Sequence, residues 1–127
     1  MTALVLDAGS FVAVDRGDRR IAAKLRAAEQ SGIDLRSTGV VIAEVWRDER
    51  GRQASLARLL KGVDVQPVDQ RLGQDAGALL GRAGAKDPVD ATVVAIAATG
   101  DRILTSDPGD IRRLVAASRR AIHVVGC

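Results

Sequence analysis

The chain has 127 residues, a formal net charge of +3 and a sequence pI of about 9.7, which fits one soluble globular domain. No apolar run approaches the roughly 18 residues that cross a bilayer, and no basic leader precedes the first apolar run, so we expect a cytoplasmic protein. The single cysteine, Cys127, excludes an internal disulfide and is expected as a free thiol, and the 2% aromatic content argues against a base-stacking platform.

Strands and helices are predicted to alternate along the whole chain. The first strand is apolar on consecutive residues, as in parallel strands covered on both faces. Asp87-Pro88 and Asp107-Pro108 are each typical of a helix start, with a capping residue before proline. This alternation indicates an α/β fold with a parallel sheet of about five strands and right-handed crossovers. In chain order we expect a strand at 4–6, a helical turn from Ser10, a helix from about Asp18 to Ser31-Gly32, a weak strand at 33–35, a helix capped by Ser37 or Thr38, a helix after Gly51, a strand at 63–68, a helix after Asp69, a helix from Asp87 to Thr99-Gly100, a strand at 103–105, a helix from Asp107 and a strand at 122–125.

Four acidic residues end or interrupt apolar runs. Asp7 and Asp107 follow predicted strands, whereas Glu44 and Asp90 lie in apolar helical stretches and are expected to point toward the sheet. A carboxylate among apolar neighbours costs several kcal/mol unless it is paired, hydrogen-bonded or bound to a metal. Sites in open α/β sheets form beyond the carboxyl ends of the strands. The four acids are therefore predicted to share one site for a divalent cation.

The chemistry of the donor set favours Mg²⁺ or Mn²⁺. Two unit charges about 4 Å apart repel by about 4 kcal/mol at an effective dielectric of 20, so clustered carboxylates must either bind a proton or bind a cation. Oxygen-only ligands suit magnesium and manganese. Zinc is a poor candidate, because His123 and Cys127 are the only residues of their types and lack partners at ligand spacing.

Each acid also has a purely structural interpretation. Asp7, Asp87 and Asp107 precede predicted helices and are candidate N-caps, a role that fits Asp87 best. Glu44 is positioned to pair with Arg47. Asp90 is the hardest to explain structurally, because Asp87 already caps its helix. The coincidence of all four acids favours the metal site.

The segments that carry these acids resemble, in order and spacing, the PIN-domain ribonucleases, specifically the VapC-type toxins of VapBC toxin–antitoxin modules. The resemblance covers essentially the whole chain. One departure is that the family often has a hydroxyl residue two positions after the first acid, where this chain has Gly9; Ser10 is a candidate substitute. The matching segments are residues 4–10, 41–46, 87–91 with the helix that follows, and 103–110.

The resemblance implies a single-domain α/β/α sandwich over residues 1–127 and an Mg²⁺- or Mn²⁺-dependent endoribonuclease that acts on cellular RNA such as tRNA or rRNA. It implies a homodimer and a small antitoxin protein as partner. Asp7, Glu44, Asp90 and Asp107 would hold the metal for attack by water on the phosphodiester, giving a 5′-phosphate and a 3′-hydroxyl. Ser10, Asp87 and Asp110 are possible accessory residues. Candidate RNA-binding arginines are Arg16, Arg19, Arg20, Arg47, Arg50 and Arg52.

Other functional classes fit less well. The main alternative is a catalytically inactive PIN-like scaffold that binds RNA or a partner protein. A phospho-acceptor receiver needs an acidic pair near the first strand and a late lysine, but no lysine follows Lys86. A haloacid-dehalogenase-like phosphatase needs a second aspartate where Gly9 stands. A nucleotide-binding module needs a glycine-rich phosphate loop, and the sequence lacks one.

Overall fold

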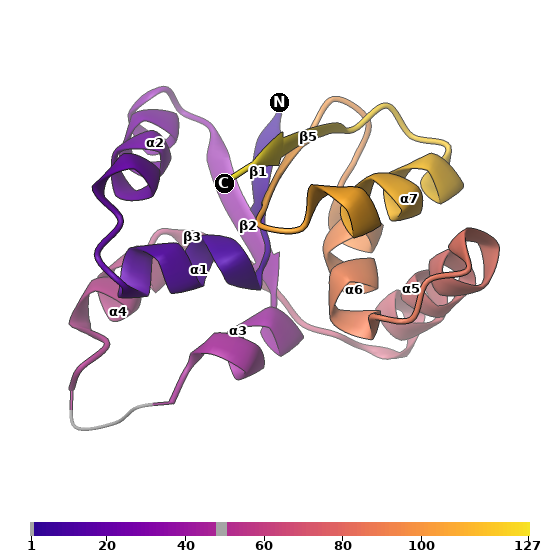
Figure 1. Cartoon of the computed structure of the whole chain (residues 1–127), viewed down its shortest axis with the longest axis horizontal. Helices are drawn as coiled ribbons and strands as arrows, with labels where there is room; N and C mark the ends of the chain where they lie inside the picture. The colour runs from indigo at the N-terminus through magenta and orange to yellow at the C-terminus, as the bar shows by residue number, and fades with distance from the viewer. Residues whose placement is uncertain (1, 48–50) are drawn as a thin grey trace.

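A five-stranded parallel sheet with the strand order β3-β2-β1-β4-β5 forms the centre of the computed structural model, which describes residues 2–47 and 51–127 (Figure 1). The predicted α/β class and parallel sheet are confirmed. In chain order the elements are β1 (Ala3–Leu6), α1 (Ala8–Asp15), α2 (Arg19–Gln30), β2 (Asp34–Thr38), α3 (Gly39–Val45), α4 (Ala54–Leu60), β3 (Val63–Gln66), α5 (Gln70–Ala83), α6 (Pro88–Ile96), β4 (Arg102–Thr105), α7 (Pro108–Ser118) and β5 (His123–Gly126).

Helices lie on both faces of this sheet. The chain moves from β1 to β2 to β3 in one direction, and then crosses to β4 and β5 on the other side of β1. Because such crossovers are right-handed, α1 to α4 belong to one face and α5 to α7 to the other. Figure 1 shows these two groups on opposite sides of the strands. None of the described helices is long and apolar enough to cross a membrane.

The core lies on the two central strands. All four residues of β1 are buried, and Ile103, Leu104 and Thr105 of β4 have no exposed surface. Phe11 of α1 is also fully buried. Cys127, the last residue of the chain, is exposed and carries a free thiol.

Several predicted elements have different bounds in the structure: α1 begins at Ala8 rather than Ser10, β3 ends at Gln66 rather than at 68, and β5 is shifted by one residue. The clearest differences are in β2 and at the end of α6. β2 is longer than the weak 33–35 pattern indicates, because Ser37 and Thr38 at its end are buried and Ser37 Oγ donates to the Leu6 carbonyl at 2.7 Å. Thr38 occupies the N-cap position of α3 but makes no side-chain capping bond. The helix from Asp87 ends at Ile96 rather than at Thr99, because Ala97 has extended backbone angles. Arg120 Nη1 then binds the free carbonyls of this helix end, at 2.7 Å for Ala97 and 3.1 Å for Ala95.

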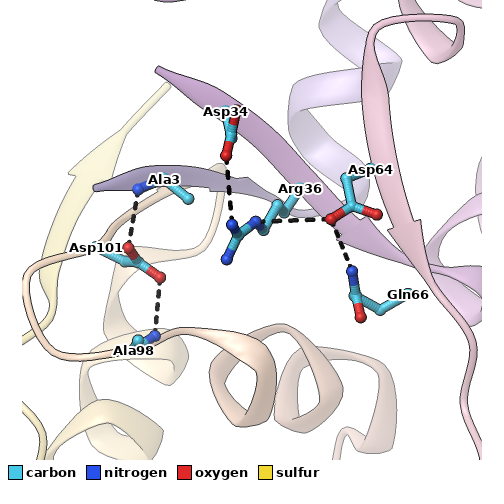
Figure 2. Close-up of polar contacts among 7 residues, drawn as sticks. All are labelled: Ala3, Asp34, Arg36, Asp64, Gln66, Ala98 and Asp101. Atoms are coloured by element: carbon cyan, nitrogen blue, oxygen red, sulfur yellow. Dashed lines mark hydrogen bonds and ion pairs between the residues drawn. The ribbon is translucent and has the colours of Figure 1, made fainter. Parts of the chain in front are cut away.

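Polar side chains at the amino end of the sheet are paired (Figure 2). Asp101, only 2% exposed, accepts hydrogen bonds from the backbone N–H groups of Ala3 and Ala98, each at 2.8 Å. Arg36 on β2 lies between two carboxylates, 3.3 Å from Asp34 and 3.7 Å from Asp64. These contacts join the start of β1 to the α6–β4 turn and fasten β2 to the edge strand β3.

Candidate metal centre

Asp7 lies directly beyond β1, at the carboxyl end of the sheet, and is 4% exposed. It caps α1, since its Oδ1 accepts from the Ser10 backbone N–H at 3.1 Å. Its Oδ2 accepts from Thr105 Oγ1 at 2.5 Å. Burial raises the pKa of Asp7, and hydrogen bonds from Thr105, Ser10 and Ser106 offset part of that rise. The structural interpretation of Asp7 as an N-cap is therefore confirmed, and the cap lies inside the acidic site.

Thr105, the last residue of β4, links the first acid to the fourth. Its hydroxyl donates to Asp7 and accepts from the backbone N–H of Asp107 at 2.9 Å. Thr105 is fully buried, and so is its bond to Asp7, whereas its bond with the Asp107 backbone is part-buried. Sequence reasoning did not select Thr105. The available signal was a hydroxyl side chain at the end of an apolar strand, two residues before an acid.

Ser10, a possible accessory residue in the sequence, lies next to Asp7. It is fully buried, and its hydroxyl donates to the Leu104 carbonyl at 2.9 Å while lying 3.4 Å from Asp7 Oδ1. The predicted accessory therefore contacts the first acid and ties α1 to β4.

Three carboxylates from α6 and the start of α7 form the tightest acidic group. Asp90, Asp107 and Asp110 each offer an oxygen, and these oxygens all lie within 4.8 Å of one another. Asp90 is half-buried, and α6 is fixed against β2 by a 2.9 Å hydrogen bond between the Thr92 and Thr38 hydroxyls. Asp107 is exposed at the N-cap position of α7 but makes no capping bond. Asp110, predicted only as an accessory, thus lies among the central acids.

Asp90 has the most perturbed acidity of the group. Burial, followed by the charges of Asp87, Asp7, Asp107 and Asp110, raises its pKa to about 7. Its carboxylate receives no hydrogen bond from the part of the chain that the structure describes. A carboxyl group that resists ionisation at neutral pH, in a group of like charges, is a candidate functional residue.

The prediction that Glu44 points toward the sheet is wrong. The short helix α3 uses Val41 and Val45, four residues apart, as its buried positions, and Glu44 falls on the exposed side. It still belongs to the acidic environment, because desolvation and then the charges of Asp87 and Asp7 raise its pKa. No ion pair with Arg47 is found among the described residues; Arg47 instead donates to the Ala43 and Trp46 carbonyls at 3.1 and 2.8 Å.

Asp87 is the N-cap that its sequence predicts. Its Oδ1 accepts from the backbone N–H groups of Val89 and Asp90, at 2.9 and 3.3 Å. It therefore fixes the first turn of α6, where Asp90 lies, and its charge acts on both Asp90 and Glu44.

The donor set fits a hard divalent cation. Opposite ligands of an octahedral Mg²⁺ lie about 4.2 Å apart, since each is about 2.1 Å from the metal. Adjacent ligands of the same octahedron lie about 3 Å apart, so carboxylate oxygens within 4.8 Å of one another need side-chain shifts of up to about 2 Å to share one ion. Oxygen-only ligation suits Mg²⁺ or Mn²⁺ better than zinc. Asp90, Asp107 and Asp110 would be the direct holders, with Asp7 and Glu44 adding negative charge nearby.

The structure gives a steric reason for glycine at position 9, which could not be seen in the sequence. A Cβ built on residue 9 would overlap Ser106 Oγ and would lie 2.5 Å from Ser106 Cβ and 3.2 Å from its backbone nitrogen. The Ser106 hydroxyl therefore occupies the space that a side chain at position 9 would take. Ser106 also supplies one of the hydrogen bonds that lower the pKa of Asp7, through its backbone.

Three of the candidate RNA-binding arginines lie apart from Asp7, whereas the charge of Arg47 acts on Glu44 and offsets part of the rise in its pKa. Arg16 ends α1 and Arg19 and Arg20 follow, whereas Asp7 caps the opposite end of that helix. A helix of eight residues spans about 12 Å, so these arginines are not neighbours of the carboxylates. Arg19 lines a separate groove of about 460 Å³ between α1, α2 and α4. Arg47 and Arg52 are exposed, and Arg50 lies outside the described residues.

Comparison with known proteins finds likeness in structure but not in sequence. No family model and no curated protein matches the chain. A chain of VapBC2 from Rickettsia felis, solved bound to a DNA fragment from their promoter, superposes with a TM-score of 0.73 at 12% identity, covering 99% of each chain. The fold is the same. A chain of FitAB bound to the IR36 DNA fragment superposes with a TM-score of 0.63 at 12% identity, covering 97% of this chain and 94% of the other. This chain therefore has the PIN-like α/β fold of these neighbours, and at such identity the likeness establishes the fold alone.

Proposed function

We propose that residues 1–127 form a metal-dependent endoribonuclease domain, the toxin of a type II toxin–antitoxin system. The observation that carries the proposal is the convergence of Asp90, Asp107 and Asp110 within 4.8 Å at the carboxyl end of the sheet. The PIN-like fold shared with VapBC2 supports it, and so do the short acid-bearing segments, whose order and spacing resemble those of VapC-type toxins. RNA such as tRNA or rRNA is the proposed substrate, a small antitoxin the proposed partner, and a homodimer the proposed assembly.

The roles proposed for the side chains follow from their contacts. Asp90, Asp107 and Asp110 hold Mg²⁺ or Mn²⁺, and Asp7 and Glu44 complete the negative environment. A bound cation of this kind lowers the pKa of water and neutralises charge on phosphoryl oxygens. Thr105 orients Asp7 and the Asp107 backbone. Asp87 fixes the turn that presents Asp90.

The test is cleavage of total tRNA and rRNA by the purified protein in Mg²⁺, in Mn²⁺ and in EDTA. Asp90→Asn and Asp107→Asn should each lower the metal-dependent rate by at least about 100-fold, the scale of losing one charged group in a catalytic site. Asp75→Asn is the matched control, because Asp75 is an exposed aspartate on α5 that is not part of the acidic group. Its rate should equal that of the wild type.

The alternative, an inactive PIN-like scaffold, gives a different pattern. A protein that melts cooperatively, binds RNA or a partner, and cuts nothing in either metal would favour the scaffold. Metal-dependent stabilisation provides an independent readout, because a ligand at 100 times its Kd stabilises the folded state by about 2.7 kcal/mol. Cleavage that persists in EDTA, or that survives both substitutions, would refute the proposed site.

A further inference from the structure

A hollow of about 300 Å³ opens beside the acidic group, between the α5–α6 turn and the first turns of α7. Residues 84–87, Asp90, Asp110, Arg113 and Leu114 line it. Small-ligand sites range from about 300 to 1,000 Å³, so the hollow has room for a unit as small as one nucleotide. Two of the three clustered carboxylates therefore form part of its wall.

The hollow carries positive as well as negative charge. Lys86 and Arg113 line it together with Asp87, Asp90 and Asp110. In the part of the chain that the structure describes, the ion pairs found do not include Lys86, so its ammonium is not committed to the neighbouring acids. A polyanion that approaches the acidic group would meet these two cations at its rim.

Arg113 is held in place by the protein. Its Nη2 donates to the carbonyls of Ala83 and Gly84, both at 3.2 Å, where α5 ends. Its Nη1 lies 3.7 Å from Asp110 Oδ1. The side chain nevertheless remains 56% exposed. A guanidinium fixed in this way keeps donors available for a phosphate at a reduced entropic cost, because its planar group is already oriented.

We propose that this hollow binds the nucleotide adjacent to the phosphodiester that is cut, with Lys86 and Arg113 contacting its phosphate. The inference rests on the proposed function and extends it by assigning a substrate subsite. The carboxylates alone would repel RNA, and Lys86 and Arg113 supply positive charge in the same hollow that offsets this repulsion, to which a cation held by the acids would add. Phosphate contacts of this type fix the register of the strand without reading its sequence.

The test measures RNA binding separately from cleavage. Asp107→Asn is used as the background to block cutting, and a short fluorescein-labelled single-stranded RNA is titrated in Mg²⁺ at several salt concentrations by fluorescence anisotropy. Lys86→Gln and Arg113→Gln should each weaken binding and lower the slope of log Kd against log salt by about 0.7, the value for one phosphate contact on a single strand. Lys61→Gln and Arg112→Gln, exposed residues outside the hollow, should leave the slope unchanged.

Loss of the α5 contacts must be separated from loss of the phosphate contact. Arg113→Lys retains the charge, so it should keep most of the slope that Arg113→Gln loses. No hydrogen bond or ion pair of Lys86 is found among the described residues, so Lys86→Gln should have the melting temperature of the wild type. If Arg113→Gln unfolds, the salt slope of Lys86→Gln alone tests whether the hollow contacts a phosphate.

Failure of this inference is distinguishable from failure of the proposed function. If the wild type cuts RNA, and the salt slopes of Lys86→Gln and Arg113→Gln equal those of the controls Lys61→Gln and Arg112→Gln, the subsite is refuted and the proposed nuclease function stands. If the wild type neither cuts nor binds RNA, both fail. If RNA binds with the expected slopes but is never cut, the subsite stands and the scaffold function replaces the nuclease.

Discussion

The two ends of the sheet hold their acidic side chains in opposite ways. At the amino end, Asp101 is 2% exposed and accepts two backbone hydrogen bonds, and Arg36 lies between Asp34 and Asp64 (Figure 2). At the carboxyl end, Asp90 faces other carboxylates and receives no hydrogen bond from the described residues. Burial alone therefore does not mark a functional acid. What distinguishes Asp90 is that the protein leaves its charge uncompensated.

Asp7 combines both arrangements. It belongs to the carboxyl end, but Thr105 and Ser10 hydrogen-bond it as fully as backbone groups bond Asp101. Such bonds favour the charged form of a carboxyl group, whereas burial and acidic neighbours favour the protonated form. The site thus has one acid that the protein holds in position and a neighbouring group that needs a cation. The uncompensated carboxylates at the carboxyl end of the sheet therefore lower the stability of the fold, whereas the paired carboxylates at the amino end contribute to it.

The largest effect on stability is expected from Asp101→Ala. The substitution removes the acceptor for the backbone N–H groups of Ala3 and Ala98 and should lower the free energy of unfolding by about 2–4 kcal/mol, as two hydrogen bonds to a charged group are lost. Urea denaturation in EDTA measures it, with Asp75→Ala as the exposed control. Equal stabilities for the two variants would remove the contrast between the ends of the sheet.

A smaller loss is expected from Gly9→Ser at the carboxyl end. The new Cβ would overlap the Ser106 side chain, and overpacking of this kind costs about 1–3 kcal/mol. Ser106→Gly in the same chain removes the obstructing side chain and should recover most of the lost stability. A double-mutant cycle in urea measures the coupling. Additive effects of the two substitutions would mean that residues 9 and 106 do not compete for one space.

The fold was largely predictable because its signals are local. Consecutive apolar residues at 4–6 and at 103–104 predict two inner strands, and both are found, as the central strand β1 and its neighbour β4. Asp87 and Asp69 are found as the N-caps expected of them. The end of α6 was not predictable, because Ala97 to Thr99 are ordinary helix residues. Arg120, which binds the last carbonyls of that helix, is remote in the sequence.

The site was predictable in position but not in detail. Strand ends place Asp7 and Asp107 at one edge, and their local sequence is sufficient for that. The exposure of Glu44 depends on which residues of a seven-residue helix reach the core, and the apolar residues Val40 to Ala43 on all sides of that helix do not specify this. The roles of Ser106 and Arg113 depend on contacts between segments far apart in the chain, so no local pattern predicts them. Thr105 has one local signal, a hydroxyl at the end of an apolar strand, but its bond to Asp7 is also a contact between distant segments.

The smallest expected effect is a gain in stability from Asp90→Asn, and it tests the difference between the two ends of the sheet most directly. Without metal, Asp90→Asn should stabilise the protein at pH 8 by about 1 kcal/mol, because it removes a carboxylate that burial and like charges disfavour; one pKa unit corresponds to about 1.4 kcal/mol before discounting for solvent screening. The sign follows from the pKa of Asp90, which is raised from 3.8 to about 7 in the folded protein. Between those values the folded state binds the proton more tightly than the unfolded state, so wild-type stability falls as pH rises and then levels off. The variant lacks this loss, and its advantage should vanish toward pH 4.

Saturating Mg²⁺ should reverse the order of the two proteins. The cation binds the ionised carboxylate, so it stabilises the wild type more at pH 8 than at pH 6, while Asp90→Asn gains less at either pH. Thermal melts at the two pH values, in EDTA and in Mg²⁺, measure all these differences, with Asp75→Asn as control. If Asp90→Asn instead lost stability in EDTA at pH 8, the folded protein would be compensating the Asp90 charge. Asp90 would then resemble Asp101, and its uncompensated charge could no longer be the reason to place a metal at this end of the sheet.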